Sequence, residues 1–117
     1  MAAGTVHIPW YATVFRGDKL AAALEEIAPL ALRYGATEFA LYRSRDDAYK
    51  FLQLASFGSK LEFERYWYGE EFSNFRVDVA TWYQVPVLYV WNDVLVAGGA
   101  GTNGNGQLAA ATEGGTA

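Results

Sequence analysis

The chain has 117 residues, a formal net charge of −4, no cysteine and a single histidine. This length suits one folded domain, and the lack of cysteine excludes disulfides, thiolate zinc sites, iron–sulfur clusters and a cysteine nucleophile. One histidine also excludes a metal site built from several histidines of one chain. An acidic balance is not typical of nucleic-acid binders, so neither a metal nor a nucleic-acid partner is expected.

The two ends of the chain differ from its middle in composition. Residues 1–5 are small and uncharged, without the basic start and apolar stretch of a secretory signal, and no apolar run is long enough to span a membrane. We therefore expect a cytoplasmic protein without membrane contact. Residues 98–117 are mostly Gly, Ala, Thr and Asn, which bury too little apolar surface to fold. The expected organisation is an N-terminal extension at 1–5, a domain at 6–97 and a flexible tail at 98–117.

Aromatic residues make up 16% of the chain, and all of them lie between Trp10 and Trp91. A core of this size cannot enclose so many large rings alone. Some of the rings are therefore expected to face a second subunit or a ligand cavity.

The first predicted elements are a strand and a helix. Residues 6–15 alternate between two largely apolar faces, which predicts a strand covered on both sides, with Pro9 at an edge or bulge. Asp18 stands at the N-cap position of a helix that carries one apolar stripe: Leu20, Leu24, Ile27, Ala31 and Tyr34. Pro29 is expected to kink this helix and Gly35 to end it.

The second half of the domain predicts a hairpin, a helix and a last strand. Residues 38–44 and 49–57 flank a polar turn, as in a hairpin. Ser59 and Glu62 form a capping box that opens a helix, which Gly69 interrupts before a second short helical piece at 70–76. Residues 81–91 are β-branched and aromatic, which predicts a strand with Pro86 at an edge or bulge.

This order, β-α-β-β-α-β, predicts an α+β, ferredoxin-like fold with two helices on one face of a four-stranded antiparallel sheet. The other face carries rings that are too large and too many to leave in water. Pairing of two copies through that face is the simplest way to cover it.

A set of residues between Leu41 and Trp67 resembles a known family. It comprises Leu41-Tyr42-Arg43-Ser44, the Asp46-Asp47 turn, the strand with Phe51, and Phe57-Gly58-Ser59 opening a helix with Phe63 and Tyr66. The pattern is similar to the antibiotic biosynthesis monooxygenase-like group of the dimeric α/β-barrel superfamily. Phe57 stands where that group has a tryptophan, and Tyr66 stands where it has a histidine.

The resemblance implies a homodimer in which two sheets pair into a dimeric α/β barrel. Some members of the group are cofactor-free oxygenases of quinols or polycyclic aromatic compounds, and others degrade haem with a helical histidine that Tyr66 replaces here. The implied function is a small-molecule-binding protein with an aromatic-lined pocket that oxygenates a phenolic or quinol compound without a cofactor. The alternatives are a non-catalytic dimerisation or binding module, or a subunit of a larger assembly.

Six residues are candidates for the site. His7 is the one side chain whose ordinary pKa suits proton transfer near neutrality, so it is the candidate catalytic base; a solvated histidine at the start of a strand is the alternative. Arg43 can hold an anionic substrate group, or it can form a surface ion pair. Four aromatic residues are candidate walls of the substrate pocket, with core packing as the alternative for each: Trp10, Phe57, Tyr66 and Trp67.

Overall fold

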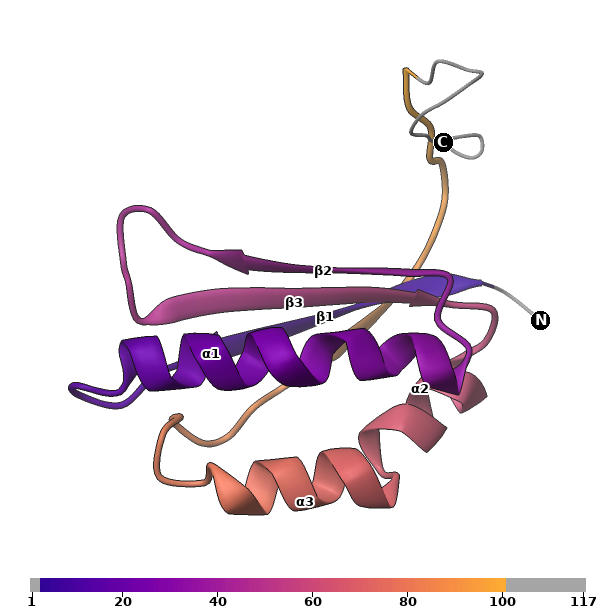
Figure 1. The fold of residues 1–117 in the computed structure, drawn as a ribbon. Coiled ribbons are helices and arrows are strands. Elements are labelled where there is room, and N and C mark those ends of the chain that lie inside the picture. Colours follow the sequence, from indigo (N-terminus) through magenta and orange to yellow (C-terminus); the bar gives the residue numbers. More distant parts are fainter. Residues whose placement is uncertain (1–2, 101–117) are drawn as a thin grey trace.

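A computed structural model describes residues 3–100 as one sheet with helices packed on one of its faces (Figure 1). The strands are β1 (Gly4–Tyr11), β2 (Glu38–Arg43), β3 (Lys50–Phe57) and β4 (Val90–Asp93). The helices are α1 (Gly17–Ile27), the 3₁₀ helix η1 (Ala28–Tyr34), α2 (Lys60–Trp67) and α3 (Glu70–Asp78). No helix in this part of the chain combines the length and apolarity that a membrane crossing requires.

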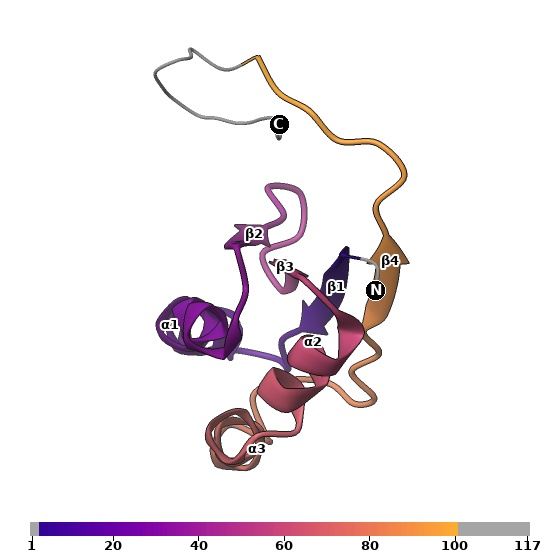
Figure 2. The ribbon, with the colours of Figure 1, turned by 90° about the vertical axis from the view of Figure 1, so that its right-hand side faces the viewer.

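The sheet is antiparallel throughout, with the strand order β2-β3-β1-β4. This confirms the predicted α+β class and the four-stranded sheet, and the helical layer covers one side of it (Figure 2). β1 begins at Gly4, two residues before the predicted start, because Gly4 and Thr5 pair with both β3 and β4. Of the tail predicted at 98–117, residues 101–117 lie outside the described part of the chain.

The alternation of β1 and β3 divides the sheet into a helix side and an open face. Side chains on the helix side are buried: Val6, Ile8, Trp10, Phe51, Gln53, Ala55 and Phe57. The stripe of α1 packs onto them through Leu20 and Leu24, both fully buried. Each such side chain contributes about 1.5–3 kcal/mol to folding, so this stripe fixes α1 on the sheet.

The long helix predicted from Asp18 is two helices in the structure. α1 ends at Ile27 and the chain continues as η1, because Pro29 has no N–H to donate to the α-helical ladder. Gly35 ends η1 in the left-handed conformation at φ 101°, as predicted. The prediction that Asp18 is the N-cap was wrong. α1 begins at Gly17, and the Asp18 carboxylate pairs with Arg43 instead.

The capping box at α2 is confirmed in one half and different in the other. The Ser59 hydroxyl accepts from the Glu62 N–H at 3.3 Å, as predicted. The Glu62 carboxylate, however, accepts from the N–H of Gly58 at 3.1 Å, one residue before the cap.

The strand predicted at residues 81–91 was wrong in its extent, because only Val90 and Trp91 of it belong to β4. β4 pairs with β1 from Asp93 opposite Gly4 to Val90 opposite His7, and an isolated bridge joins Ala12 to Tyr83 further along. Between these two pairings β1 has four residues (8–11) and the other segment has six (84–89), so the two segments cannot pair residue for residue. Continued pairing in the β4 register would set Pro9 and Pro86 in the ladder, and neither has an N–H to donate.

Candidate functional site

A pocket of about 290 Å³ lies on the helix side, between α1 and the β2 edge of the sheet. We call it the helix-side pocket, and its lining is Ala21, Glu25, Ala28, Phe39, Leu41, Arg43 and Phe51. The alanines come from the helices and leave room, since larger side chains there would fill the space. The two phenylalanine rings stand on β2 and β3, so the pocket offers an apolar floor with one acidic and one basic group.

Arg43 is the predicted site residue that lines this pocket. Its Nη2 donates to the Asp18 carboxylate at 2.9 Å, and its Nε donates to the Ala48 carbonyl at 2.8 Å. Its guanidinium also lies 5.2 Å from the centre of the Phe51 ring. Asp18 is almost fully exposed, and exposed ion pairs are weak. This ion pair therefore leaves the Arg43 guanidinium available to hold another anionic group.

The four predicted aromatic residues lie together in the core. Trp10 packs 6.3 Å from Trp67, and Phe57 packs 5.9 Å from Tyr66, between ring centres. Trp10, Phe57 and Tyr66 are fully buried and Trp67 nearly so. We call them, with Phe63 and Phe72, the aromatic cluster. It adjoins the helix-side pocket because Trp10 stands directly opposite Phe51 in the β1–β3 ladder.

A polar chain that the sequence analysis missed crosses the aromatic cluster. Trp10 Nε1 donates to Gln53 Oε1 at 3.0 Å, and Gln53 Nε2 donates to the Tyr66 hydroxyl at 2.9 Å. Burial raises the pKa of Tyr66 far above its usual range, so this hydroxyl stays neutral. The available signal was Gln53 itself, a polar residue at an inward position of an alternating strand.

His7 lies apart from the aromatic cluster and the helix-side pocket. It is exposed on the open face, where it stands opposite Leu54 of β3 and Val90 of β4. The β1 backbone separates it from Trp10, which points to the helices. The structure therefore brings together the four aromatic residues and sets Arg43 beside them, but it places His7 on the other face.

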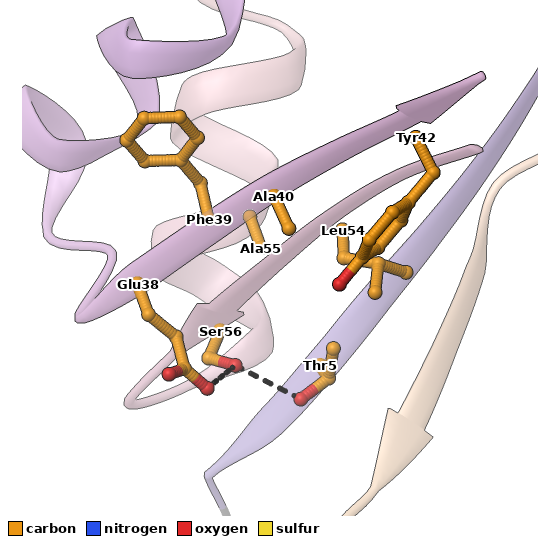
Figure 3. Close-up of a pocket in the computed structure, with 8 residues that line it drawn as sticks. All are labelled: Thr5, Glu38, Phe39, Ala40, Tyr42, Leu54, Ala55 and Ser56. Carbon is orange, nitrogen blue, oxygen red and sulfur yellow. Dashed lines mark hydrogen bonds between the residues drawn. The ribbon is translucent and has the colours of Figure 1, made fainter. Parts of the chain in front are cut away.

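The open face carries a hollow of about 190 Å³ (Figure 3). At one end the Ser56 hydroxyl donates to Glu38 at 3.1 Å and lies 3.0 Å from the Thr5 hydroxyl. Because Ser56 donates to the carboxylate, Thr5 is left to donate to Ser56. At the other end Tyr42 and Leu54 form an apolar wall (Figure 3).

Between residues 3 and 100, no three His, Asp or Glu side chains gather closely enough to hold an ion.

Comparisons with known proteins connect this geometry to solved structures. No protein-family model and no curated protein sequence matches the chain. The PA3566 protein of Pseudomonas aeruginosa matches with a TM-score of 0.73 at 18% identity, over 82% of this chain and 97% of its own. A Nitrosomonas europaea protein, provisionally named an antibiotic biosynthesis monooxygenase, matches with a TM-score of 0.72 at 16% identity, over 80% and 91%.

A third neighbour has a described activity. SnoaB of Streptomyces nogalater, described as a cofactor-independent oxygenase, matches with a TM-score of 0.70 at 12% identity, over 82% of this chain and 96% of its own. The likeness extends over nearly the whole described domain and includes the sheet and the helices that cover it. The chain has the fold of the antibiotic biosynthesis monooxygenase-like proteins, as the pattern from Leu41 to Trp67 predicted.

Proposed function

We propose that this protein is a homodimer that binds a planar phenolic or quinol compound in the helix-side pocket and oxygenates it without a cofactor. The observation that carries the proposal is the pocket itself, which combines two phenylalanine rings with Arg43 and Glu25 beside the aromatic cluster. Ligand sites are typically apolar hollows with a few fixed polar groups, and this pocket has that composition.

The lining specifies the ligand's chemistry. A flat ring suits the space between the helical alanines and the two phenylalanine rings, where stacking adds to the gain from burial. An oxygen at the edge of the ring would accept from the Arg43 guanidinium, and a second hydroxyl would donate to Glu25. Trp10 stands opposite Phe51 in the β1–β3 ladder, so the aromatic cluster borders the pocket without lining it.

The chemistry needs no reductant. A phenol that takes up O₂ leaves as a quinone and water: one oxygen atom enters the ring, the other leaves as water, and the substrate supplies all four electrons. The first requirement is a phenolate: the phenol gives its proton to solvent water, and a guanidinium beside the bound phenol lowers the pKa of that phenol. The described activity of SnoaB, which shares the fold, supports this choice.

The open face supports the homodimer. It leaves large apolar side chains in water, including Tyr42, Tyr11 and Val90, all more than 40% exposed. Large apolar side chains left exposed on one face of a sheet are typical of an interface. The proposed partner is a second copy, with two open faces packed against each other.

A non-catalytic binding or dimerisation module is the second candidate, because one observation favours it. The aromatic residues singled out from the sequence fill the core, where they pack against one another, and His7 stands on the far side of the sheet from them. In that case the rings serve stability, and the protein would bind a ligand or a partner without turnover.

The test combines binding and oxygen uptake. Two- and three-ring phenols and hydroquinones are titrated by calorimetry, and oxygen consumption is followed with an electrode. Arg43→Ala is expected to weaken binding about 10- to 100-fold, since a hydrogen bond to a charged group contributes about 1.5–3 kcal/mol. Arg65→Ala, which removes the same charge from the exposed side of α2, is the matched control and is expected to leave binding unchanged.

A second variant tests the pocket's volume. Ala21→Leu places a larger side chain in the helix-side pocket and is expected to block binding while circular dichroism shows the fold retained. Binding that survives both Ala21→Leu and Arg43→Ala would refute this pocket as the site. Binding without oxygen uptake supports the module, and light scattering that gives a monomer mass refutes the homodimer.

A further inference from the structure

The turn between β1 and α1 holds a bulky residue in an unfavourable backbone conformation. The Arg16 N–H donates to the Thr13 carbonyl at 3.0 Å, which closes a four-residue turn with Val14 and Phe15 at its centre. Phe15 has a φ of 67°, and a positive φ at the third position is typical of a type II turn, where glycine or asparagine is usual. A bulky side chain in this region is an outlier, and it destabilises the turn relative to glycine.

The two central residues of this turn are also exposed. Phe15 is 89% exposed and Val14 is 66% exposed. The turn is the outermost point of the molecule at the end of the sheet away from the start of β1 (Figure 1). One exposed hydrophobic residue is ordinary in a folded protein. Here the exposure coincides with backbone strain, and neither contributes to the stability of the fold, so together they indicate a function in binding.

Hydrogen bonds fix the base of the turn. The Thr13 N–H donates to the Trp82 carbonyl at 3.0 Å, and the Thr13 hydroxyl donates to the Thr81 carbonyl at 2.8 Å. The N–H of Phe15 donates to the Tyr49 hydroxyl at 3.4 Å. Because these partners lie in two other parts of the chain, they hold the turn in one arrangement before anything binds to it.

Basic side chains surround the turn. Residues 13–19 and 43–50 lie at this end of the sheet, where the β1–α1 and β2–β3 connections are neighbours (Figure 1). They contain five of the nine basic residues of the chain: Arg16, Lys19, Arg43, Arg45 and Lys50. They contain only three acidic residues, and one of these, Asp18, pairs with Arg43. This end is therefore positive, although the whole chain carries a net charge of −4, and it suits an anionic partner.

The small size of the apolar tip favours a lipid surface over a protein. Stable protein interfaces bury about 1,200–2,000 Å² in total, and two side chains on a projecting turn supply a small part of that area. A bilayer requires less, because a few apolar side chains enter its interfacial region while Lys and Arg side chains contact anionic headgroups. The basic residues stand on both connections at this end, so they can reach such headgroups together.

We propose that the turn at 13–16 docks the protein on an anionic bilayer, with Val14 and Phe15 in the interfacial region and the surrounding basic side chains on the headgroups. The sequence analysis expected no membrane contact because no segment is long enough to span a bilayer, and docking by a turn requires no such segment. The proposal goes beyond the oxygenation proposed above and does not depend on it, because the turn does not line the helix-side pocket.

Sedimentation with lipid vesicles tests the docking of the full chain. Vesicles of phosphatidylcholine and phosphatidylserine in equal parts supply the anionic surface, and vesicles of phosphatidylcholine alone supply the neutral one. The parent chain is expected to bind the anionic vesicles at least about tenfold more strongly, and added salt is expected to weaken this binding. Equal binding to both kinds of vesicle overturns the proposal. Binding to neither also overturns it, and an acidic protein is then the partner that the charges fit.

A substitution of Phe15 separates docking from stability. Asparagine tolerates a positive φ, so Phe15→Asn is expected to unfold at a urea concentration no lower than the parent does, while its affinity for the anionic vesicles falls at least about tenfold. Leu95→Asn is the matched control, because Leu95 is 93% exposed and follows β4 at the other end of the sheet, where Asp93 stands opposite Gly4. The control is expected to bind as the parent does. Retained binding by Phe15→Asn, or an equal loss in Leu95→Asn, overturns the proposal.

Removal of charge gives a second measurement that leaves the turn intact. Arg45→Gln with Lys50→Gln removes two positive charges from the β2–β3 connection and is expected to weaken binding to the anionic vesicles about tenfold. The matched control, Lys60→Gln with Arg65→Gln, removes the same charge from the exposed side of α2 and is expected to change binding little. Equal effects of the two pairs would show a general electrostatic attraction without docking at this end, and would overturn the proposal.

Discussion

The indole N–H of Trp10 meets the side-chain oxygen of Gln53 at 3.0 Å in the middle of the aromatic cluster. The side-chain amide nitrogen of Gln53 in turn donates a hydrogen bond to the Tyr66 hydroxyl. β1, β3 and α2 each contribute one group, so the chain joins two central strands to the helix above them. Buried polar groups cost free energy unless they are paired, and here each pair depends on the other.

Removing Gln53 should therefore destabilise the fold more than removing the Tyr66 hydroxyl. Gln53→Met leaves both the Trp10 N–H and the Tyr66 hydroxyl without a partner and is expected to lower the free energy of unfolding by about 2–4 kcal/mol. Tyr66→Phe leaves only one amide donor unpaired and should lower it by about 1–3 kcal/mol. Urea denaturation measures both. Values within about 0.5 kcal/mol of the parent for both variants would show that the chain of hydrogen bonds does not contribute to stability.

The start of α2 depends on one side chain. Ser59→Ala removes the acceptor for the Glu62 N–H and is expected to lower the free energy of unfolding by about 1 kcal/mol. Ser59→Asp restores a cap of equal quality and should recover most of that loss. The comparison uses the same urea titration. A loss in both variants would mean that the size of the side chain at this buried position matters and the cap does not.

Local signals in the sequence predicted the elements whose ends are fixed by their own residues. Gly35 ends η1 because its positive φ is available to glycine at no cost, and Ser59 caps α2 through a hydroxyl three residues from its donor. The hairpin of β2 and β3 followed from the alternation of its own residues. These features need no information from distant parts of the chain.

The last strand and the site could not be predicted from local sequence, because both are fixed by residues in distant parts of the chain. Residues 81–91 favour strand locally, but the ladder depends on whether β1 can donate, and Pro9 cannot. Asp18 was assigned as a cap because nothing in its own segment shows that Arg43 reaches it. The helix-side pocket likewise arises where α1, β2 and β3 meet, so the sequence supplied Arg43 as a candidate but not the residues around it.

The surface network of Glu71 should make stability depend on pH. The Tyr34 hydroxyl donates to Glu71 at 2.9 Å and Arg33 pairs with it, so the pKa of this carboxyl lies below its ordinary value. A depressed pKa stabilises the folded state above the ordinary pKa, and the gain disappears as pH falls through the folded value. NMR titration of Glu71 is expected to show the depressed pKa, and Tyr34→Phe should raise it. An unchanged pKa in Tyr34→Phe would assign the shift to Arg33 alone.

His7 decides on which face of the sheet the chemistry takes place. Its side chain stands opposite Leu54 and Val90 on the open face, and the backbone of β1 lies between it and the helix-side pocket. His7→Ala is therefore expected to leave ligand binding and oxygen uptake at the parent values, whereas Arg43→Ala lowers both. The measurements are calorimetry for binding and initial rates of oxygen uptake over a series of pH values.

The opposite result would be equally informative. If His7→Ala lowers kcat while KM stays constant, and the shape of the pH–rate profile changes with it, then His7 moves a proton of the bound substrate. The substrate would then lie on the open face, where Leu54, the residue opposite His7, lines the hollow between Thr5, Ser56 and Tyr42 (Figure 3). Thr5→Val, which removes a hydroxyl from that hollow and nothing from the helix-side pocket, would separate the two sites by its effect on KM.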